Sequence, residues 1–158
     1  MNRQPILLQP RDYERSLTVL GVDITILASN RETSGLEVTL QAGAEGIGPP
    51  PHRHDWDEAF FVLDGQVEIH CEGRTFVCGR GGFAHVPAGT LHGYRFGPGG
   101  GRMFEVSGRF AADGAVAMGE RGSATRMFTN VARDAPEGTA DIPKLLRVLE
   151  DNGVTIAA

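Results

Sequence analysis

Three histidines and one glutamate near the middle of the chain have the residue types and the spacing of metal ligands. His52, His54 and Glu58 lie close together in the sequence, and His92 follows 34 residues after Glu58. Because side chains on an extended strand alternate between two faces, the three even-numbered positions point to one side. Imidazole nitrogens suit Zn, Cu, Fe and Ni, and a carboxylate adds affinity for harder ions such as Mn. The pattern predicts one mononuclear metal site, with His92 supplied by a separate strand.

The alternative reading of these histidines is that they are ordinary surface or hydrogen-bonded residues, and a His-x-His pair alone would not exclude it. The added Glu58 and the later Pro87-x-Gly89-x-x-His92 favour metal binding. Closed structural zinc sites are tetrahedral and usually rich in cysteine. Three nitrogens and one oxygen fill only part of an octahedron, so we expect one divalent transition metal per chain with open positions. Its identity stays open among Fe, Mn, Ni, Co and Zn.

The same residues carry a resemblance to the cupin superfamily. Its first motif is matched by Gly46, His52, His54, Glu58 and Gly65 at the family's spacing, and its second by Gly81, Pro87, Gly89 and His92. The resemblance implies that the four ligands are His52, His54, Glu58 and His92. The short separation of the two motifs is similar to that in small single-domain, quercetin-dioxygenase-like cupins. The second motif usually ends in Asn, where this chain has Phe96, and this favours a more apolar pocket wall.

Composition and length agree with one all-β domain. The 158 residues include 22 glycines and nine prolines between short apolar runs, which is typical of strands and turns. Together with the resemblance, they predict a cupin jelly roll, a double-stranded β-helix barrel with a short C-terminal helical extension. We expect an N-terminal segment with the first strands (1–34), a barrel core (35–107) and a helical extension that packs on the barrel (108–158).

Local patterns predict further elements. Residues 16–28 indicate β structure bent at Gly21, and residues 36–41 alternate like a half-buried strand with Leu36, Val38 and Leu40 on one face. Asp64-Gly65 is typical of a two-residue hairpin turn, which would pair Phe60 with Ile69 and keep Glu58 inside. The glycine-rich residues 97–101 indicate a hairpin loop. A short helix is expected over 110–118, residues 119–140 have no clear pattern, and a capped amphipathic helix followed by a short strand is expected after Asp141.

The substrate pocket is expected on the face that carries the ligands. Phe60, Tyr94 and Phe96 fall on that face by alternation and would suit an aromatic or otherwise apolar substrate. Plain core packing is an equally good interpretation of these aromatic residues. Glu58 could remain a metal ligand throughout, or take a proton from the substrate, a catalytic role that the dioxygenase resemblance implies.

The leading functional hypothesis is a metal-dependent oxygenase, a quercetinase-like dioxygenase of a small aromatic or enol substrate. One alternative is a cupin without catalytic activity that binds a small molecule or a metal. Another is a redox-neutral cupin isomerase or decarboxylase. One scaffold hosts many chemistries, so the fold alone does not decide between these.

Net charge and hydropathy limit the classes of partner that we expect. The net charge of −5 argues against a nucleic-acid partner, and the absence of a long apolar run argues against a membrane span. A cytoplasmic location is the default expectation. Apolar residues predicted to face outward, among them Phe61 and Leu63, need cover, so we expect a homodimer. Cys71 and Cys78 are expected to be free thiols.

Overall fold

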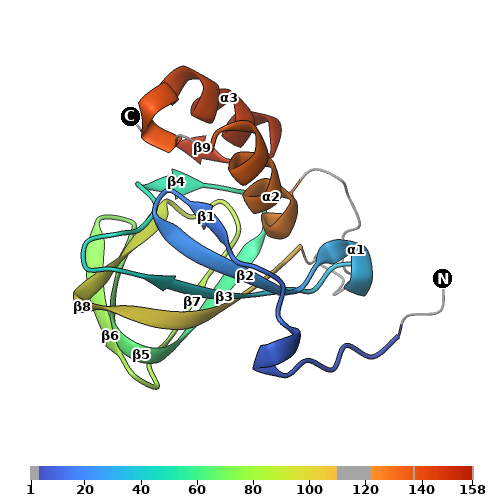
Figure 1. Cartoon of the computed structure of the whole chain (residues 1–158). Coiled ribbons are helices and arrows are strands. Elements are labelled where there is room, and N and C mark those ends of the chain that lie inside the picture. Colours follow the sequence, from blue (N-terminus) through green and yellow to red (C-terminus); the bar gives the residue numbers. More distant parts are fainter. Residues whose placement is uncertain (1–3, 110–121, 137, 158) are drawn as a thin grey trace.

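The computed structural model describes residues 4–109, 122–136 and 138–157, so the helix expected over 110–118 lies outside the described residues. A curled sheet forms the body of the molecule, and C-terminal helices lie across one end of it (Figure 1). The strands are β1 (Leu17–Val19), β2 (Val22–Ala28), β3 (Glu37–Gly43), β4 (His52–Arg53), β5 (Asp57–Cys71), β6 (Arg74–Gly79), β7 (Phe83–Val86), β8 (His92–Gly108) and β9 (Thr155–Ile156). The helices are η1 (Pro10–Asp12), α1 (Asn30–Thr33), α2 (Ala124–Asp134), η2 (Gly138–Asp141) and α3 (Ile142–Asp151).

Every strand pair in this sheet is antiparallel. The order β1-β2-β3-β8-β4-β9 forms one path, and β5 pairs with β6, β7 and β8. The two long strands β5 and β8 run beside each other and curl, so that their inner faces enclose the core. This arrangement confirms the all-β jelly roll expected from the sequence.

The hairpin expected at Asp64-Gly65 is wrong, because β5 continues through these residues without turning back. Phe60 lies opposite Ala84 and Glu105, not opposite Ile69. The pairing with β8 shifts register on both sides of Asp64, as in a β-bulge, and Gly65 has a positive φ of 69°. The bulge changes the alternation of inward and outward residues. The residues before and after it therefore share one buried face, as a hairpin would also have required: Glu58, Phe60, Val62, Val67 and Ile69.

The loop expected at residues 97–101 is also wrong, because these glycines lie inside β8. Gly101 pairs with both Gly43 and Gly65 on the two neighbouring strands. A Cβ atom at Gly65 would collide with the carbonyl oxygen of Gly100, so the strands approach closely only because a side chain is missing. Glycine therefore marks a bend in paired strands here, although the same composition is typical of a loop.

The strand predicted from residue 36 is present, but it turns its polar face inward. Glu37, Thr39 and Gln41 are 1%, 0% and 2% exposed, whereas Leu36 is 47% exposed. Thr39 lies opposite Glu105 on β8, which supplies a polar partner inside the barrel. Burying polar groups is tolerated when they are hydrogen-bonded to one another, and this explains why the alternation alone predicted the wrong face.

A C-terminal cover, which we define as α2, α3 and β9, closes one end of the barrel (Figure 1). The expected helix after Asp141 is present, and the Asp141 carboxylate caps it by accepting the Lys144 backbone N–H at 3.1 Å. Leu145 and Leu149 of its apolar stripe are buried, but Ile142 and Leu146 are exposed, so the stripe packs only in part. Helix α2, in the segment without a clear pattern, was not predicted.

Glu37 anchors this cover to the barrel. Its carboxylate accepts the backbone N–H groups of Ala124 at 3.0 Å and Thr125 at 2.8 Å, together with the Ser123 hydroxyl at 2.8 Å. A carboxylate at a helix N-terminus satisfies donors that the helix itself leaves free. Strand β9 adds a second attachment, because Ile156 pairs with His52 on β4. In the described part of the chain, no helix has the length and apolar character needed to cross a membrane.

Candidate metal centre

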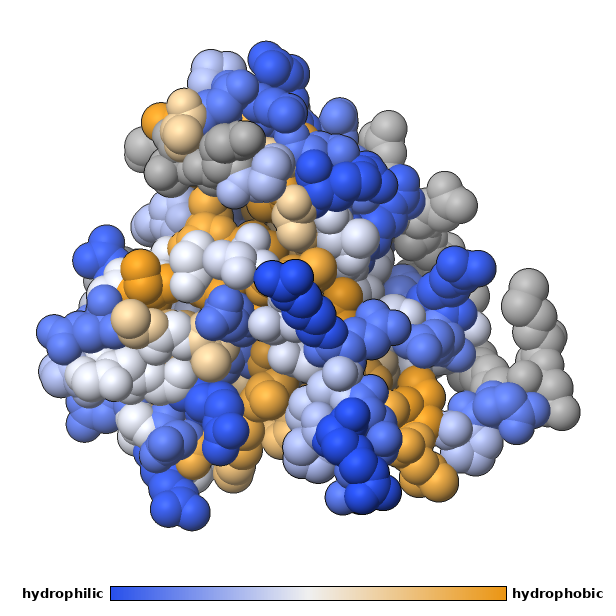
Figure 2. All heavy atoms as spheres, in the orientation of Figure 1, coloured by the Kyte–Doolittle hydropathy of each residue, from blue (hydrophilic) through white to orange (hydrophobic). Residues whose placement is uncertain are grey.

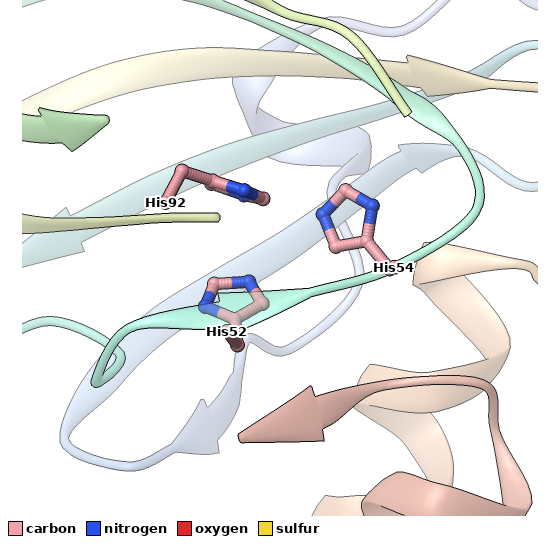
Figure 3. Close-up of side chains that lie close together, drawn as sticks. All are labelled: His52, His54 and His92. Carbon is pink, nitrogen blue, oxygen red and sulfur yellow. The ribbon is translucent and has the colours of Figure 1, made fainter. Parts of the chain in front are cut away.

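The fold brings three of the predicted ligands together at the covered end of the barrel. His52 lies on β4 and pairs directly with His92 at the start of β8, while His54 follows β4 in the chain. One ligand nitrogen from each ring lies within 4.8 Å of the others, and all three side chains are buried (Figure 3). His52, His54 and His92 thus form a cluster able to hold a metal ion.

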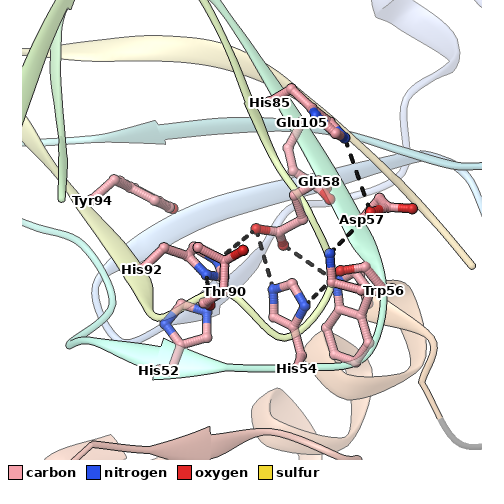
Figure 4. A network of polar contacts seen from close by, with 12 residues as sticks. His52, His54, Trp56, Asp57, Glu58, His85, Thr90, His92, Tyr94 and Glu105 are labelled. Atoms are coloured by element: carbon pink, nitrogen blue, oxygen red, sulfur yellow. Dashed lines mark hydrogen bonds and ion pairs between the residues drawn. The ribbon is translucent and has the colours of Figure 1, made fainter. Parts of the chain in front are cut away.

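Hydrogen bonds fix which ring nitrogen faces the centre. Each Nδ1 lies 2.9 Å from a backbone carbonyl oxygen two residues away: Pro50 for His52, Trp56 for His54 and Thr90 for His92. Figure 4 shows His54 with its partner Trp56. A carbonyl can only accept, so each Nδ1 carries the proton and donates it. In a neutral ring the Nε2 atom then keeps a free lone pair, which is the tautomer that metal-binding histidines use.

The Glu58 carboxylate lies beside the Nε2 atoms of His54 and His92, and no cationic side chain lies among these three groups. Its Oε2 atom lies 3.0 Å from Nε2 of His92 and 3.3 Å from Nε2 of His54. With both Nδ1 atoms protonated, these three atoms are all acceptors in the neutral state, and they can approach so closely only around a proton or a cation. The buried His54 Nε2 has no hydrogen-bond partner in the described residues. A divalent ion would satisfy all of these atoms, so the residues fit a metal, and ligation by Glu58 itself stays a prediction.

The titration of the site is set by burial and by the Glu58 charge. Burial lowers the pKa of His52 to about 4, so this ring is neutral and ready to bind a cation. Burial alone would raise the pKa of Glu58, but the rings of His54 and His92 outweigh it and hold that pKa well below its usual range. Burial lowers the pKa of His92, but the hydrogen bond to Glu58 and the Glu58 charge together outweigh burial. The pKa of His92 is therefore raised above its ordinary value. Below this raised pKa, the metal-free protein holds a proton on His92.

We expect metal affinity to fall in acid, because the ion must displace the proton on His92. Below the raised pKa of His92 the apparent affinity should drop by about tenfold per pH unit, and above it the affinity should level off. His52 adds nothing near neutrality, because its pKa is about 4. Titration with Co²⁺ at pH 6 and pH 8 checks this, and equal affinity at both values would contradict the assignment.

Trp56 offers an internal signal for the Co²⁺ titration. Its ring stacks on His54 with centroids 4.0 Å apart and planes only 2° from parallel, and its Nε1 donates to Glu58 at 3.4 Å. It is the only tryptophan in the chain and is 1% exposed. Its fluorescence should therefore report binding of an ion at His54.

A mainly apolar cavity lies beside the cluster. It is lined by His52, His54 and Glu58, by barrel residues that include Val22, Ile24, Gln41, Phe60 and Tyr94, and by Met127, Phe128, Leu149, Val154 and Ile156 of the C-terminal cover and its connection. On the face seen in Figure 2, hydrophobic residues gather where the cover meets the barrel. Phe60 and Tyr94 contribute to the cavity wall, whereas Phe96 is buried behind it and packs against Tyr94. Substrate contact by Phe60 and Tyr94 stays a prediction.

A second carboxyl group, Glu105, is buried inside the barrel. It is 0% exposed, and burial, followed by the Glu58 charge, raises its pKa to about 8. Its Oε2 accepts the Thr39 hydroxyl at 2.7 Å, while its Oε1 has no partner in the described residues. Glu105 is therefore mainly protonated at neutral pH.

Replacing Glu105 by glutamine should remove a pH dependence of stability. Between pH 4.5, the ordinary value for the unfolded chain, and pH 8, the folded state holds a proton that the unfolded state has lost, so the free energy of unfolding falls as pH rises. We expect metal-free Glu105→Gln to gain about 2 to 4 kcal/mol relative to the wild type between pH 5 and pH 8. Urea unfolding at both pH values measures this. A difference that does not change with pH would show that Glu105 is ionised, and Glu68→Gln on the same sheet is the control.

An antiparallel jelly roll with a histidine cluster at one end is the arrangement of a cupin. Residues 36–104 match the family model described as the Cupin domain. The barrel core of the chain therefore matches the cupin family, as the motifs in this stretch indicated.

Known proteins add the following similarities. Quercetin 2,3-dioxygenase of Bacillus subtilis (strain 168) is 38% identical over 95 residues, which cover 59% of this chain and 28% of that protein. The chain thus spans less than a third of that relative's length. An RmlC-like cupin from Shewanella frigidimarina aligns with a TM-score of 0.60 at 19% identity, over 72% of this chain and 98% of the other. The polyketide cyclase RemF from Streptomyces resistomycificus aligns with a TM-score of 0.57 at 21% identity, over 73% of this chain and 85% of the other. At these identities the two structures show the fold alone.

Proposed function

We propose that the protein is a metal-dependent oxygenase that acts on a small enol or phenol. The observation that carries the proposal is the set of three free Nε2 lone pairs that converge with the Glu58 carboxylate beside a buried apolar cavity. The partial similarity to a quercetin 2,3-dioxygenase supports oxygenation as the reaction class. Bound at this site, a transition metal would supply an open position for an oxygen ligand and for dioxygen.

The residues of the chain supply the remaining parts of this reaction. Glu58 lies where one carboxylate oxygen can take the hydroxyl proton of an enol while the three histidines hold the ion. Trp56 donates to the other oxygen of Glu58 and thereby orients it. The C-terminal cover limits the access of bulk water to the reacting groups, because its Phe128 and Leu149 line the cavity.

Oxygen consumption tests the proposal directly. Protein loaded in turn with Fe²⁺, Mn²⁺, Ni²⁺ or Co²⁺ is mixed with flavonols, phenols and small diketones in an oxygen electrode. We expect substrate-dependent uptake of dioxygen with at least one metal. Conversion of a substrate without oxygen uptake would instead indicate the redox-neutral alternative. Tight binding of a metal or small molecule with no conversion would indicate a binding protein.

We also propose that a second copy of the chain covers the outer face of the sheet. Phe61 on β5 lies opposite Phe83 on β7 and opposite Phe104 on β8, and Phe61 and Phe83 are 45% and 64% exposed. This row of uncharged aromatic residues can face its own copy without repulsion between like charges, and exposed apolar patches of this kind mark interaction sites.

The mass in solution tests the homodimer. We expect twice the 16.9 kDa of one chain for the wild type, and a single chain for Phe83→Glu, because a buried unpaired carboxylate opposes association. Light scattering after size exclusion measures both. Leu146→Glu, on an exposed residue of α3, is the control and should stay dimeric. A wild-type mass of one chain would refute the interface.

A further inference from the structure

We propose that Gln41 is a substrate-binding residue, whose amide N–H donates to an oxygen atom of a small and otherwise apolar ligand in the cavity beside the metal centre. The inference deepens the proposed function and rests on it only in placing the ligand at that same centre. Gln41 comes from β3, a strand that carries none of the predicted metal ligands.

The position of Gln41 is the first argument. Its side chain is 2% exposed, and it lines the cavity together with Phe60 and Tyr94. Apart from the metal-site residues and the Tyr94 hydroxyl, the other side chains of the lining are apolar. Cavities of this kind select their ligands through a few placed polar groups on an apolar wall. An amide here is therefore suited to recognise one polar atom of a ligand.

A chain of hydrogen bonds fixes how the amide is turned. The Thr39 hydroxyl donates its single proton to Glu105 at 2.7 Å, so it must accept the bond from Nε2 of Gln41 at 3.1 Å. The Oε1 atom of Gln41 then accepts the Tyr94 hydroxyl. A tyrosine hydroxyl is ordinarily protonated at neutral pH, so it can donate this bond.

One N–H group of Gln41 has no acceptor in this row of hydrogen bonds. The amide carries two N–H groups, one of which goes to Thr39, and the described residues provide no second acceptor. If the proton of Glu105 moved to Oε2, donor and acceptor would exchange in each of these hydrogen bonds, and the Gln41 amide would turn over. It would then donate to Tyr94 and would still keep one uncommitted N–H. A buried donor without a partner is unfavourable, so the site is built to receive an acceptor from a ligand.

The size of the cavity narrows the ligand class. The cavity has a volume of about 60 Å³, so it suits a ligand of small size. The ligand that fits has a small apolar body and carbonyl or enolate oxygens, one of which accepts from Gln41 while another reaches the metal centre. Small diketones in their enol form have this chemistry, whereas a flavonol would require the C-terminal cover to move.

Binding of acetylacetone to Co²⁺-loaded protein without oxygen tests the role of Gln41. We expect Gln41→Leu to bind this diketone roughly tenfold more weakly than the wild type, with unchanged Co²⁺ affinity measured by Trp56 fluorescence. Gln41→Met removes both N–H groups at similar side-chain length and serves if the leucine variant does not fold. Thr39→Val should weaken binding by a smaller factor, because it removes only the group that orients the amide.

Gln66→Leu is the matched control, because Gln66 is exposed on β5, and it should bind like the wild type. Equal binding by the wild type and by both Gln41 variants would overturn the proposal, and so would a Co²⁺-loaded wild type that does not bind the diketone at all. The proposed oxygenase activity fails separately, if the diketone binds in a Gln41-dependent way but no dioxygen is consumed. Oxygen uptake with the same KM in Gln41→Leu would overturn the role of Gln41 and leave the oxygenase intact.

Discussion

Replacing His54 by alanine is expected to reduce the affinity for a transition metal by at least about a hundredfold. His54 supplies one of three converging Nε2 atoms, and its tautomer is held by the Trp56 carbonyl at 2.9 Å. Loss of a residue that only orients a ligand already costs up to about a hundredfold in affinity, and loss of the ligand itself should cost no less. Elemental analysis should fall from close to one ion per chain in the wild type to a small fraction.

His85→Ala is the control for this experiment. His85 is a histidine of the same chain, but its side chain is 53% exposed and only approaches Asp57 at 4.0 Å. Its replacement should leave the metal content unchanged. If the His54 variant retained a full complement of metal while the wild type also bound one ion, the ion would have to reside elsewhere in the chain.

Replacing Glu58 by glutamine is expected to lower the rate of oxygen uptake by about a hundredfold or more, since general base catalysis typically contributes that much. The amide keeps the shape of the side chain and an oxygen that faces the metal, but it cannot take a proton. The three histidines remain, so we expect most of the metal to stay bound. Oxygen electrode traces, read beside the metal content of the same sample, separate the two effects.

Glu68→Gln is the matched control, because Glu68 lies on the same strand but is not in the buried face. It should turn over at the wild-type rate. A Glu58→Gln protein with full activity would limit Glu58 to a structural or ligand role. A variant that loses metal and activity together would assign Glu58 to the metal shell without support for a proton transfer.

The sequence predicted the fold class well, but it did not predict the path of the chain. Glycine serves both in turns and in bends of paired strands, so Gly65 and residues 97–101 indicated two turns where β5 and β8 run on. The inward placement of Glu58 and Ile69 was still correct, because a bulge and a hairpin both change the alternation at that point. The division of the chain at residues 34 and 107 stays a prediction.

The histidine cluster was predictable because its residues follow one another on an extended segment or match a motif. Gln41, Thr39 and Glu105 were not, because their significance depends on partners on other strands, 53 and 66 residues away for the first two. Alternation in β3 is visible in the sequence, but it does not say which face is inside. The proximity of Trp56 to the ligands is visible in the sequence. Its stacking on His54 is not, because it depends on the bend between β4 and β5.

X-ray diffraction from crystals grown with Co²⁺, recorded at the cobalt absorption edge, tests the account most directly. We expect one anomalous peak per chain, at bonding distance from Nε2 of His52, His54 and His92 and from a carboxylate oxygen of Glu58. A cobalt ion held by other residues, or no cobalt peak beside these Nε2 atoms at saturating Co²⁺, would contradict the metal centre and the oxygen chemistry built on it.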